Sequence, residues 1–287
     1  MSLVLGSRDF GDQASLVMAI VNRTPDSFYD RGATYDEGAA LARVAEVVAE
    51  GADIVDIGGV KAGHGEPVDE PEELRRTAAM VERVRADFPD LVISVDTWRA
   101  AVARELCMRG ADLLNDSWAG ADERLAEVAA EFGVGLVCSH SGGLAPRTDP
   151  HRVAYADVVA DVIATVTTLA DRAVSLGVRQ DGILIDPTHD FGKNTYHSLE
   201  LSRRLDEIVA TGWPVLVALS NKDFIGETLG LDVGERLIGT LAATAVSAWH
   251  GARVFRAHQV AETRQVLDMV ASISGRRPPA RAVRGLA

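Results

Sequence analysis

Short apolar runs recur along the chain, and segments with helical periodicity separate them. The runs lie at 16–21, 53–57, 91–95, 112–115, 135–139, 183–185, 215–219 and 253–255. Most are continuously apolar, which is typical of strands buried on both faces of a parallel sheet. A Gly-Ala pair introduces three of the runs, at 51–52, 110–111 and 251–252. Because each pair follows a helical pattern, we expect its glycine to end a helix in the left-handed conformation.

The segments between the runs carry apolar residues every three to four positions. They lie at 36–50, 71–88, 99–109, 124–132, 155–176, 197–211, 235–250 and 261–273. Strict alternation of strands and helices means parallel strands joined by right-handed crossovers. About eight such units predict an α/β fold, a single-domain (β/α)8 TIM barrel. An open doubly wound sheet is the alternative, and it lacks a GxGxxG motif after the first strand.

The two ends of the chain differ from the rest. Residues 1–14 are polar, and we expect them to form a short N-terminal arm or plug. Residues 15–274 then make the barrel. The tail at 275–287 is rich in proline and arginine, which predicts a disordered C-terminal segment.

Charge and composition limit the classes of partner. Lysine and arginine total 29 against 42 acidic residues, a net charge of −13, which argues against nucleic acid or an anionic membrane surface as the partner. No apolar stretch reaches the roughly 20 residues that span a bilayer, and the N-terminus does not resemble a signal peptide. Cys107 and Cys138 have no zinc-site spacing. We therefore expect a reduced, cytoplasmic protein.

Polar residues follow the predicted strands, at the face where barrels carry their active sites. They are Asn22, Asp56, Asp96, Asn115, Ser139, His140, Asp186, Ser220, Lys222, Arg256 and His258. Each alone has a structural explanation, such as a helix cap or a turn. Together they predict a polar cup that contains opposite charges.

This cup suits a flat heterocycle. Asp96, Asp186 and the amide of Asn115 offer acceptors and donors for an amide-like ring edge, and Lys222 adds a cation.

An anion would fit beside the heterocycle. Arg256 and His258 leave one strand end toward the same face, so they can hold a phosphate or pyrophosphate. The oxygen of Asn22 is a plausible ligand for Mg²⁺, which prefers few protein ligands together with substrate phosphates.

Seven segments resemble dihydropteroate synthase, in the same order and with compatible spacing. They are NRTPDSFYDRG (22–32), GADIVDIGG (51–59), SVDT (94–97), GADLLNDSWAG (110–120), DPTHDFGK (186–193), LSNKDFIG (219–226) and FRAHQV (255–260). The similarity covers about 16–273. It implies a homodimeric barrel that uses Mg²⁺ and joins dihydropterin-methyl pyrophosphate to para-aminobenzoate in folate synthesis.

The resemblance also implies roles for single residues on the pterin side. Asp96, Asn115, Asp186 and Lys222 match the positions that hold the pterin, and Phe191 matches a further substrate-binding position. Of these, Asp96, Asp186 and Lys222 are the expected catalytic residues.

On the pyrophosphate side, the resemblance assigns Arg256 and His258 to the anion and Asn22 to Mg²⁺. The loop that carries Asp26 and Phe28 is expected to close over the reacting centre and exclude water.

The departures from the family cluster in the half that would bind the arylamine. After Gly58 and Gly59 the family usually carries Glu-Ser-Thr-Arg-Pro-Gly, whereas this chain reads VKAGHG at 60–65. The serine that usually receives the benzoate carboxylate is replaced by Asp223. Two like charges within about 4 Å repel by roughly 1–4 kcal/mol, or about one to three powers of ten in affinity.

Further departures lie on the pterin side. Thr188 and Asp190 replace glycines of the family, so we expect added bulk where the backbone passes the pterin. Arg23 places a new arginine next to Asn22 in the sequence.

Four histidines, His64, His140, His189 and His197, lie at or near the predicted rim. Their spacing does not support metal ligation, and their roles stay open.

Three interpretations of function remain. We favour a diverged paralogue with weak or absent dihydropteroate synthase activity that still binds pterin-like or sulfa-like ligands. The second is an active dihydropteroate synthase with unusual loops. The third is a barrel transferase with another nucleophile, recognised by Lys61, His64 and Asp223. A pyrophosphate-release assay with and without para-aminobenzoate separates the three.

Overall fold

A ring of parallel strands forms the centre of the molecule. The computed structural model describes residues 1–24, 34–61, 63, 65–148 and 154–285. Within these ranges the ring consists of β3 (Leu16–Asn22), β4 (Ile54–Gly58), β5 (Val92–Asp96), β6 (Leu113–Asp116), β7 (Gly135–Ser139), β8 (Ile183–Asp186), β9 (Leu216–Val217) and β10 (Val254–Ala257). The strands pair in the order β8-β7-β6-β5-β4-β3-β10-β9, and a bridge between Ile185 and Val215 joins the ends of that order. The predicted single-domain (β/α)8 TIM barrel is confirmed.

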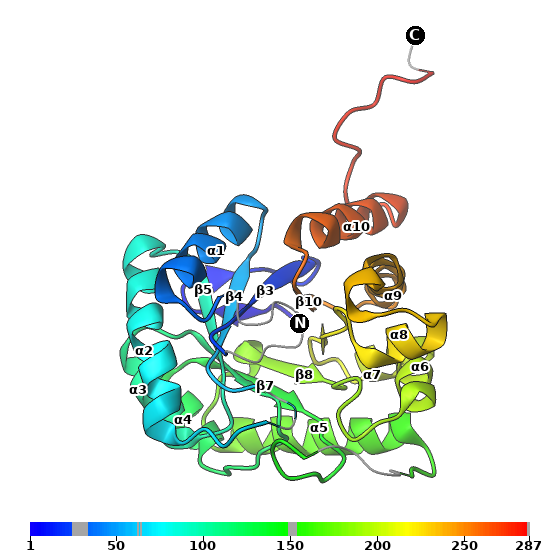
Figure 1. The fold of residues 1–287 in the computed structure, drawn as a ribbon. Coiled ribbons are helices and arrows are strands. Elements are labelled where there is room, and N and C mark those ends of the chain that lie inside the picture. The colour runs from blue at the N-terminus through cyan, green and yellow to red at the C-terminus, as the bar shows by residue number, and fades with distance from the viewer. Residues whose placement is uncertain (25–33, 62, 64, 149–153, 286–287) are drawn as a thin grey trace.

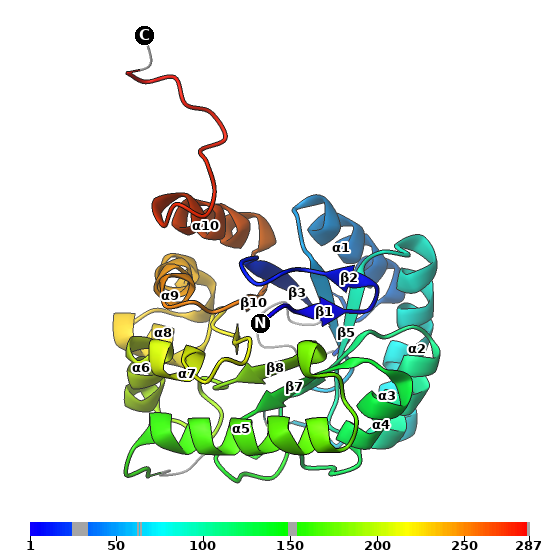
Figure 2. The ribbon, with the colours of Figure 1, turned by 180° about the vertical axis from the view of Figure 1, so that it is seen from behind.

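Helices surround the ring, as Figures 1 and 2 show. They are α1 (Glu37–Ala49), α2 (Glu70–Asp87), α3 (Ala100–Met108), α4 (Leu125–Phe132), α5 (Val158–Ser175), α6 (Thr195–Arg203), α7 (Leu205–Val209), α8 (Asp223–Leu229), α9 (Leu237–Trp249) and α10 (Val260–Ile273). Two differences from the prediction concern short helices. The helix predicted at 197–211 is divided at Arg204, and the seven-residue α8 was not predicted.

Local chemistry explains where the helices begin and end. The Asp36 side chain accepts a hydrogen bond from the Ala39 N–H and starts α1, as an N-cap aspartate does. The glycines expected to be left-handed have φ of 97° at Gly51, 102° at Gly110 and 101° at Gly251. That prediction is confirmed, and it explains why three helix–strand junctions share one pattern.

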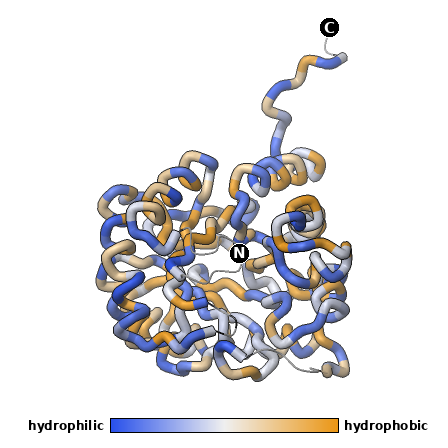
Figure 3. Tube along the Cα trace, in the orientation of Figure 1, coloured by the Kyte–Doolittle hydropathy of each residue, from blue (hydrophilic) through white to orange (hydrophobic). Residues whose placement is uncertain are grey.

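The core has two layers, because each strand is buried on both faces. Val17 and its outward neighbours pack under the helices. Met18, Ile54 and other inward residues fill the barrel. In Figure 3 hydrophobic positions gather along the central strands, while the outer helices mix hydrophobic and hydrophilic positions.

The first residues close the amino-terminal end of the barrel. The hairpin of β1 (Val4–Leu5) and β2 (Arg8–Asp9) lies across this end in Figure 2. Leu3 and Leu5 are fully buried and join the cluster inside the barrel. Arg253 fastens the segment, because its guanidinium donates to the carbonyl oxygens of Ala14 at 2.8 Å, Gly11 at 2.9 Å and Met1 at 3.3 Å.

At the C-terminal end, by contrast, the chain runs away from the barrel after α10 (Figure 1). In the described ranges we find no helix with both the length and the apolar character needed to cross a membrane.

Candidate ligand-binding site

Strand register brings the predicted polar residues to the carboxyl-terminal end of the barrel. Asn22 pairs with Gly58, Gly58 with Asp96, and Asp96 with Asn115 across neighbouring strands. We call the group at this end the mouth site. Its members are Asn22, Asp56, Asp96, Asn115, Asp186, Phe191, Lys222, Arg256 and His258.

Arg256 stands between two carboxylates at the centre of the mouth site. Its Nε lies 2.6 Å from Asp56 Oδ2 and its Nη2 lies 3.1 Å from Asp96 Oδ2. Asn115 Nδ2 donates to Asp56 at 3.1 Å, and Ser94 Oγ donates to the other Asp56 oxygen at 2.6 Å. The fully buried Asp56 is therefore the anchor of this side.

Sequence analysis placed Asp56 at the rim but gave it no role. Its signal is a carboxylate between the apolar residues Val55 and Ile57 of a predicted strand. A charge in such a position needs a paired partner when it is buried. The partner, Arg256, is distant in sequence, so the pattern alone did not reveal the pair.

The protonation of Asp96 is sensitive to its surroundings. Burial and, to a smaller extent, the Asp56 charge raise the pKa of Asp96 to about 7, against the effect of Arg256, which lowers it. Ser117 Oγ donates to Asp96 Oδ1 at 3.0 Å. A carboxyl that gains a proton near neutral pH can both accept and donate toward a ring edge.

Lys222 and Phe191 form the opposite side of the mouth site. The Lys222 Nζ donates to the His189 carbonyl oxygen and lies 4.9 Å from the centroid of the Phe191 ring, a cation–π distance. Burial lowers the pKa of Lys222, while the charges of Asp190 and Asp186 raise it. The edge of Phe191 packs on Trp118, with ring centroids 5.2 Å apart, a contact that sequence analysis missed.

Asp186 lies next to this side. Its Oδ1 accepts the Thr188 N–H at 2.7 Å. Burial raises the pKa of Asp186, and the Lys222 charge lowers it. The charges of Asp186 and Lys222 thus act on each other across this side of the mouth site.

His258 faces a different partner from Arg256. The His258 Nδ1 lies 2.9 Å from Ser220 Oγ, whereas the Arg256 guanidinium is directed to Asp56 and Asp96. Arg256 and His258, which were expected to bind phosphate, thus lie at the same strand end, and Arg256 is bonded to two acids.

The residues that replace glycines keep the glycine conformation. Thr188 has φ 52° and Asp190 has φ 70°, which is rare for a β-branched residue such as threonine. Thr188 Oγ1 lies between the Asp186 carbonyl and the His140 N–H. Asp190 accepts from Ser198 Oγ at 3.0 Å. The side chains that replace glycine are thus bonded to neighbouring groups of the protein, Thr188 within its own loop and to the residue after β7, and Asp190 to α6.

Arg23 also points elsewhere than its sequence position suggested. Its guanidinium donates to the carbonyl oxygens of Arg76 at 2.7 Å and Tyr35 at 2.8 Å. It fastens α2 to the start of α1 and leaves Asn22 at the rim. Arg23 is therefore adjacent to Asn22 in the sequence, while its guanidinium bonds to backbone groups of other segments.

The donor set at the rim fits a weakly held magnesium ion. A Cβ on Gly58 would lie 2.8 Å from Asn22 Oδ1, so glycine makes room for this amide oxygen. Elsewhere in the described residues, no group of three or more His, Cys, Asp or Glu could hold a metal. Any Mg²⁺ at Asn22 would take its other ligands from phosphate and water.

The histidines have structural contacts. His140 lies between Lys193 and Asp161. The buried His189 contacts Ser202 Oγ at 3.2 Å. His197 completes the capping box of α6.

Three other predicted residues, His64, Asp26 and Phe28, lie outside the described residues.

At the start of α8, Asp223 forms an ion pair. Arg236 Nη1 donates to Asp223 Oδ1 at 2.8 Å and also to the Asn221 carbonyl at 2.9 Å. The Asp223 side chain is 78% exposed and that of Arg236 only 10%. An internal cation thus meets the carboxylate that replaces the family serine.

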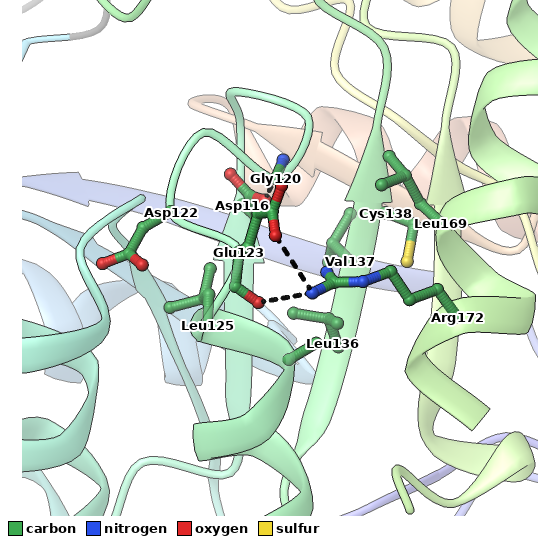
Figure 4. Close-up of a pocket in the computed structure, with 11 residues that line it drawn as sticks. Asp116, Gly120, Asp122, Glu123, Leu125, Leu136, Val137, Cys138, Leu169 and Arg172 are labelled. Carbon is green, nitrogen blue, oxygen red and sulfur yellow. Dashed lines mark hydrogen bonds and ion pairs between the residues drawn. The ribbon is translucent and has the colours of Figure 1, made fainter. Parts of the chain in front are cut away.

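A small pocket outside the ring is separate from the mouth site (Figure 4). Asp116 points into it, because adjacent side chains on a strand face opposite sides. Asp116 accepts from the backbone N–H groups of Gly120 at 2.6 Å and Trp118 at 3.0 Å. Arg172 contacts Glu123 across the pocket (Figure 4). Asp116 thereby fixes the turn that presents Trp118 to Phe191.

Comparison with known proteins identifies the family of the chain. The family described as pterin binding enzyme matches residues 18–258. The chain is 60% identical to inactive dihydropteroate synthase 2 of Mycobacterium leprae, over 100% of both proteins. It is 37% identical to dihydropteroate synthase of Haemophilus influenzae, over 88% of this chain and 92% of that protein.

Solved structures give the same result. The dihydropteroate synthase of Yersinia pestis, solved with a sulfonamide drug, has a TM-score of 0.91 and 32% identity, and covers 96% of this chain and 100% of its own. The resemblance drawn from seven sequence segments is thus confirmed. The chain belongs to the pterin-binding enzyme family, as a divergent dihydropteroate-synthase-like protein.

Proposed function

We propose that this protein binds a pterin-like or sulfa-like ligand at the mouth site and has weak or absent dihydropteroate synthase activity. The observation that carries the proposal is a contrast between two halves of one site. Asp56, Asp96 and Arg256 form a connected polar network in one half. In the other half, an Asp223–Arg236 pair stands where the family usually has serine.

The pterin half contains the groups that a flat heterocycle needs. Asp96, Asn115 and Asp186 supply buried acceptors and donors for the ring edge. Lys222 places a cation over the Phe191 ring, which leaves an apolar surface beside a charge. The Yersinia pestis relative is solved with a sulfonamide drug, which supports sulfa-like molecules as probes.

The half of the site that would bind the arylamine, formed by Asp223, Arg236 and residues 60–65, disfavours binding of an arylamine that carries a carboxylate. A benzoate carboxylate near Asp223 would meet a like charge, and water screens that repulsion because the side chain is exposed. The cation of Arg236 is already engaged with Asp223 and Asn221. The Ser, Thr and Arg of the family loop are also replaced at 60–65. These changes favour a protein that has lost binding of the arylamine and kept binding of the pterin.

Magnesium and pyrophosphate belong to the proposal as ligands of the rim. Asn22 would hold Mg²⁺ through its amide oxygen, and the bound ion would supply positive charge for phosphate oxygens. Arg256 and His258 would face the same anion from β10. Arg256 uses its Nε and Nη2 to bond Asp56 and Asp96, and a guanidinium has five N–H donors, so an anion would be met by the remaining ones.

We also propose that the protein is a homodimer through the outer face of α9. This helix has no charged residue from Leu237 to Trp249. Ile238 is 81% exposed and Trp249 is 62% exposed. Met269 of the adjacent α10 is exposed as well. A second copy would cover this apolar surface by a self-complementary contact.

The test combines binding with turnover. Calorimetry with 6-hydroxymethylpterin as probe measures the first half, and a pyrophosphate-release assay with dihydropterin-methyl pyrophosphate measures the second. We expect binding, with little or no release when para-aminobenzoate is added. Release that requires para-aminobenzoate would identify an active synthase. Release with a different amine only would identify a different transferase, and absence of pterin binding would refute the proposal.

A further inference from the structure

A buried lysine joins two loops behind the mouth site. Lys193 is only 3% exposed. Its Nζ lies 2.8 Å from His140 Nδ1 and 2.9 Å from the His140 carbonyl oxygen, at the end of β7. It also lies 3.1 Å from the Thr188 carbonyl and 2.8 Å from the Phe191 carbonyl, in the β8–α6 loop. One amine therefore gathers acceptors from both loops.

The hydrogen position on His140 follows from its other partner. His140 Nε2 lies 2.7 Å from Asp161 Oδ1. Because an ionised carboxylate only accepts, Nε2 carries the hydrogen and the Nδ1 of a neutral imidazole is an acceptor. All four neighbours of the Lys193 Nζ thus accept hydrogen bonds, which partly replaces the water lost by a charged amine.

Burial still disfavours that charge. It lowers the pKa of Lys193 to about 7, and the charges of Asp186, Asp190 and Asp161 only partly oppose it. The other charged group nearby is Lys222, which lowers this pKa further. Three histidines are the remaining titratable neighbours: burial lowers the pKa of His140, His189 and His197, and the Lys193 charge lowers each pKa further. These groups come from β8, α5, α6, the β8–α6 loop, the residue after β7 and the residue before α8.

The linkage has a definite sign. When the β8–α6 loop opens, the amine returns to water and regains its ordinary affinity for a proton. Opening therefore takes up a proton whenever the closed form is neutral, so protons favour the open loop. Above neutrality, closure should strengthen as the pH rises. Below neutrality, the Lys193 amine is protonated in both the open and the closed form, so loop closure no longer depends on pH.

We propose that Lys193 is a positioning residue that couples closure of the β8–α6 loop to release of a proton, and so sets how firmly Phe191 is held at the mouth site. The carbonyl of Phe191 is one of the atoms that Lys193 binds. The Phe191 ring lies between Trp118 and Lys222. The effect on ligand binding rests on the proposed pterin site, whereas the effect on the loop does not.

Hydrogen exchange of residues 187–194, divided by the intrinsic rate at each pH, tests the loop directly. We expect protection of the wild-type loop to rise roughly tenfold per pH unit above pH 7 and to level off below it, as for one proton. Lys193→Met should abolish this rise. Tyr155→Phe is the matched control, because Tyr155 Oη also donates to this loop, at 2.6 Å from the Gly192 carbonyl. It should lower protection by a constant factor and keep the pH dependence.

A surface variant keeps the test valid if Lys193→Met does not fold. Asp161 is about half exposed, and its charge raises the pKa of Lys193. Asp161→Asn should therefore move the level region of the profile to lower pH. A flat wild-type profile from pH 6 to 8.5 would overturn the proposal, as would an unchanged slope in Lys193→Met or an unmoved profile in Asp161→Asn.

The affinity for 6-hydroxymethylpterin, measured over the same pH range, completes the experiment. We expect the Lys193→Met change in affinity to depend on pH, and that of Tyr155→Phe to be constant. If the probe does not bind at all, the proposed function fails. The exchange data then still decide the role of Lys193 in the loop.

Discussion

The Asp223 carboxylate lies 2.8 Å from the Arg236 guanidinium at the first residue of α8. The acid that appears in place of the family serine is thus not an isolated charge. It forms an ion pair with Arg236, whose side chain is almost buried and lies beside the part of the site that would bind the arylamine. Removing the acid would leave that cation available to a carboxylate from outside.

Asp223→Ser should therefore raise the affinity for para-aminobenzoate by roughly 1.5- to fivefold, the size expected for one partly exposed ion pair. Calorimetry in the presence of 6-hydroxymethylpterin measures it. Asp206→Ser on α7 is the matched control, since it removes an exposed acid elsewhere. Grafting the family loop at 60–64 should add to the gain. No gain from the combined variant would mean that the pterin half is impaired as well.

Asp186→Asn should weaken pterin binding by about 2–5 kcal/mol, because it removes the charge of a buried, charge-assisted contact. The fold should survive, since an amide oxygen can still accept the Thr188 N–H. Calorimetry with 6-hydroxymethylpterin measures the loss. Asp181→Asn, just before β8 and paired with Arg179, serves as control. Equal affinity in Asp186→Asn would remove Asp186 from the site.

Asp56→Ala should lower the free energy of unfolding by about 3–5 kcal/mol, because it leaves the buried Arg256 with one acid fewer. Urea unfolding measures the loss. Adding Arg256→Met in the same chain should recover a large part of it, since the second change removes the uncompensated charge. Additive losses in the double variant would show that the two residues are not coupled.

Asp96 should make the protein less stable as the pH rises toward neutrality. Its pKa is about 7 when folded against 3.8 for an ordinary aspartate, so between these values the folded state binds more protons than the unfolded state. The stabilisation is complete below pH 3.8 and is lost as the pH rises through about 7, by up to about 1.4 kcal/mol per unit.

Urea unfolding at pH 5 and pH 7.5 checks this effect, with Asp96→Asn as the comparison. The fall in stability between the two pH values should be smaller in Asp96→Asn than in the wild type. Burial also raises the pKa of Asp116, to about 6, but that residue is present in both proteins and cancels. An identical fall in both would contradict the assignment.

Ile238→Asp should convert the proposed dimer to a monomer, because it places a charge at the most exposed apolar side chain of α9, in the first turn of the helix. Sedimentation velocity measures the change in mass. Met108→Asp on α3 is the control, since Met108 is 57% exposed on another helix. A wild-type protein that sediments as a monomer would end the dimer proposal.

The barrel could be predicted because its determinants are local. Continuous apolar runs mark the strands, and left-handed glycines such as Gly51 mark the helix ends. The short α8 escaped prediction, since seven residues give too few turns for a clear period.

The site was predicted in part, for a related reason. Strand ends such as Asp96 and Asp186 can be found from the pattern, and barrel topology then places them at one rim. Contacts over long sequence distances cannot be found in this way. Arg23 turns to a carbonyl on α2, and Asp56 meets Arg256 two hundred residues later. The side-chain contacts of Thr188 could not be foreseen either, because the glycine at that position in the family has no side chain to indicate them.

The contacts of Arg253 imply that the N-terminal segment is fixed late, after most of the chain has been made. Arg253 lies just before β10 and donates to the carbonyl oxygens of Met1, Gly11 and Ala14. During synthesis, the N-terminal segment can therefore make these hydrogen bonds only when translation is almost finished. Until then the barrel in which Leu3 and Leu5 are buried is incomplete. A nascent chain should expose its first hairpin throughout synthesis, and a ribosome stalled before codon 253 should carry an N-terminus open to protease.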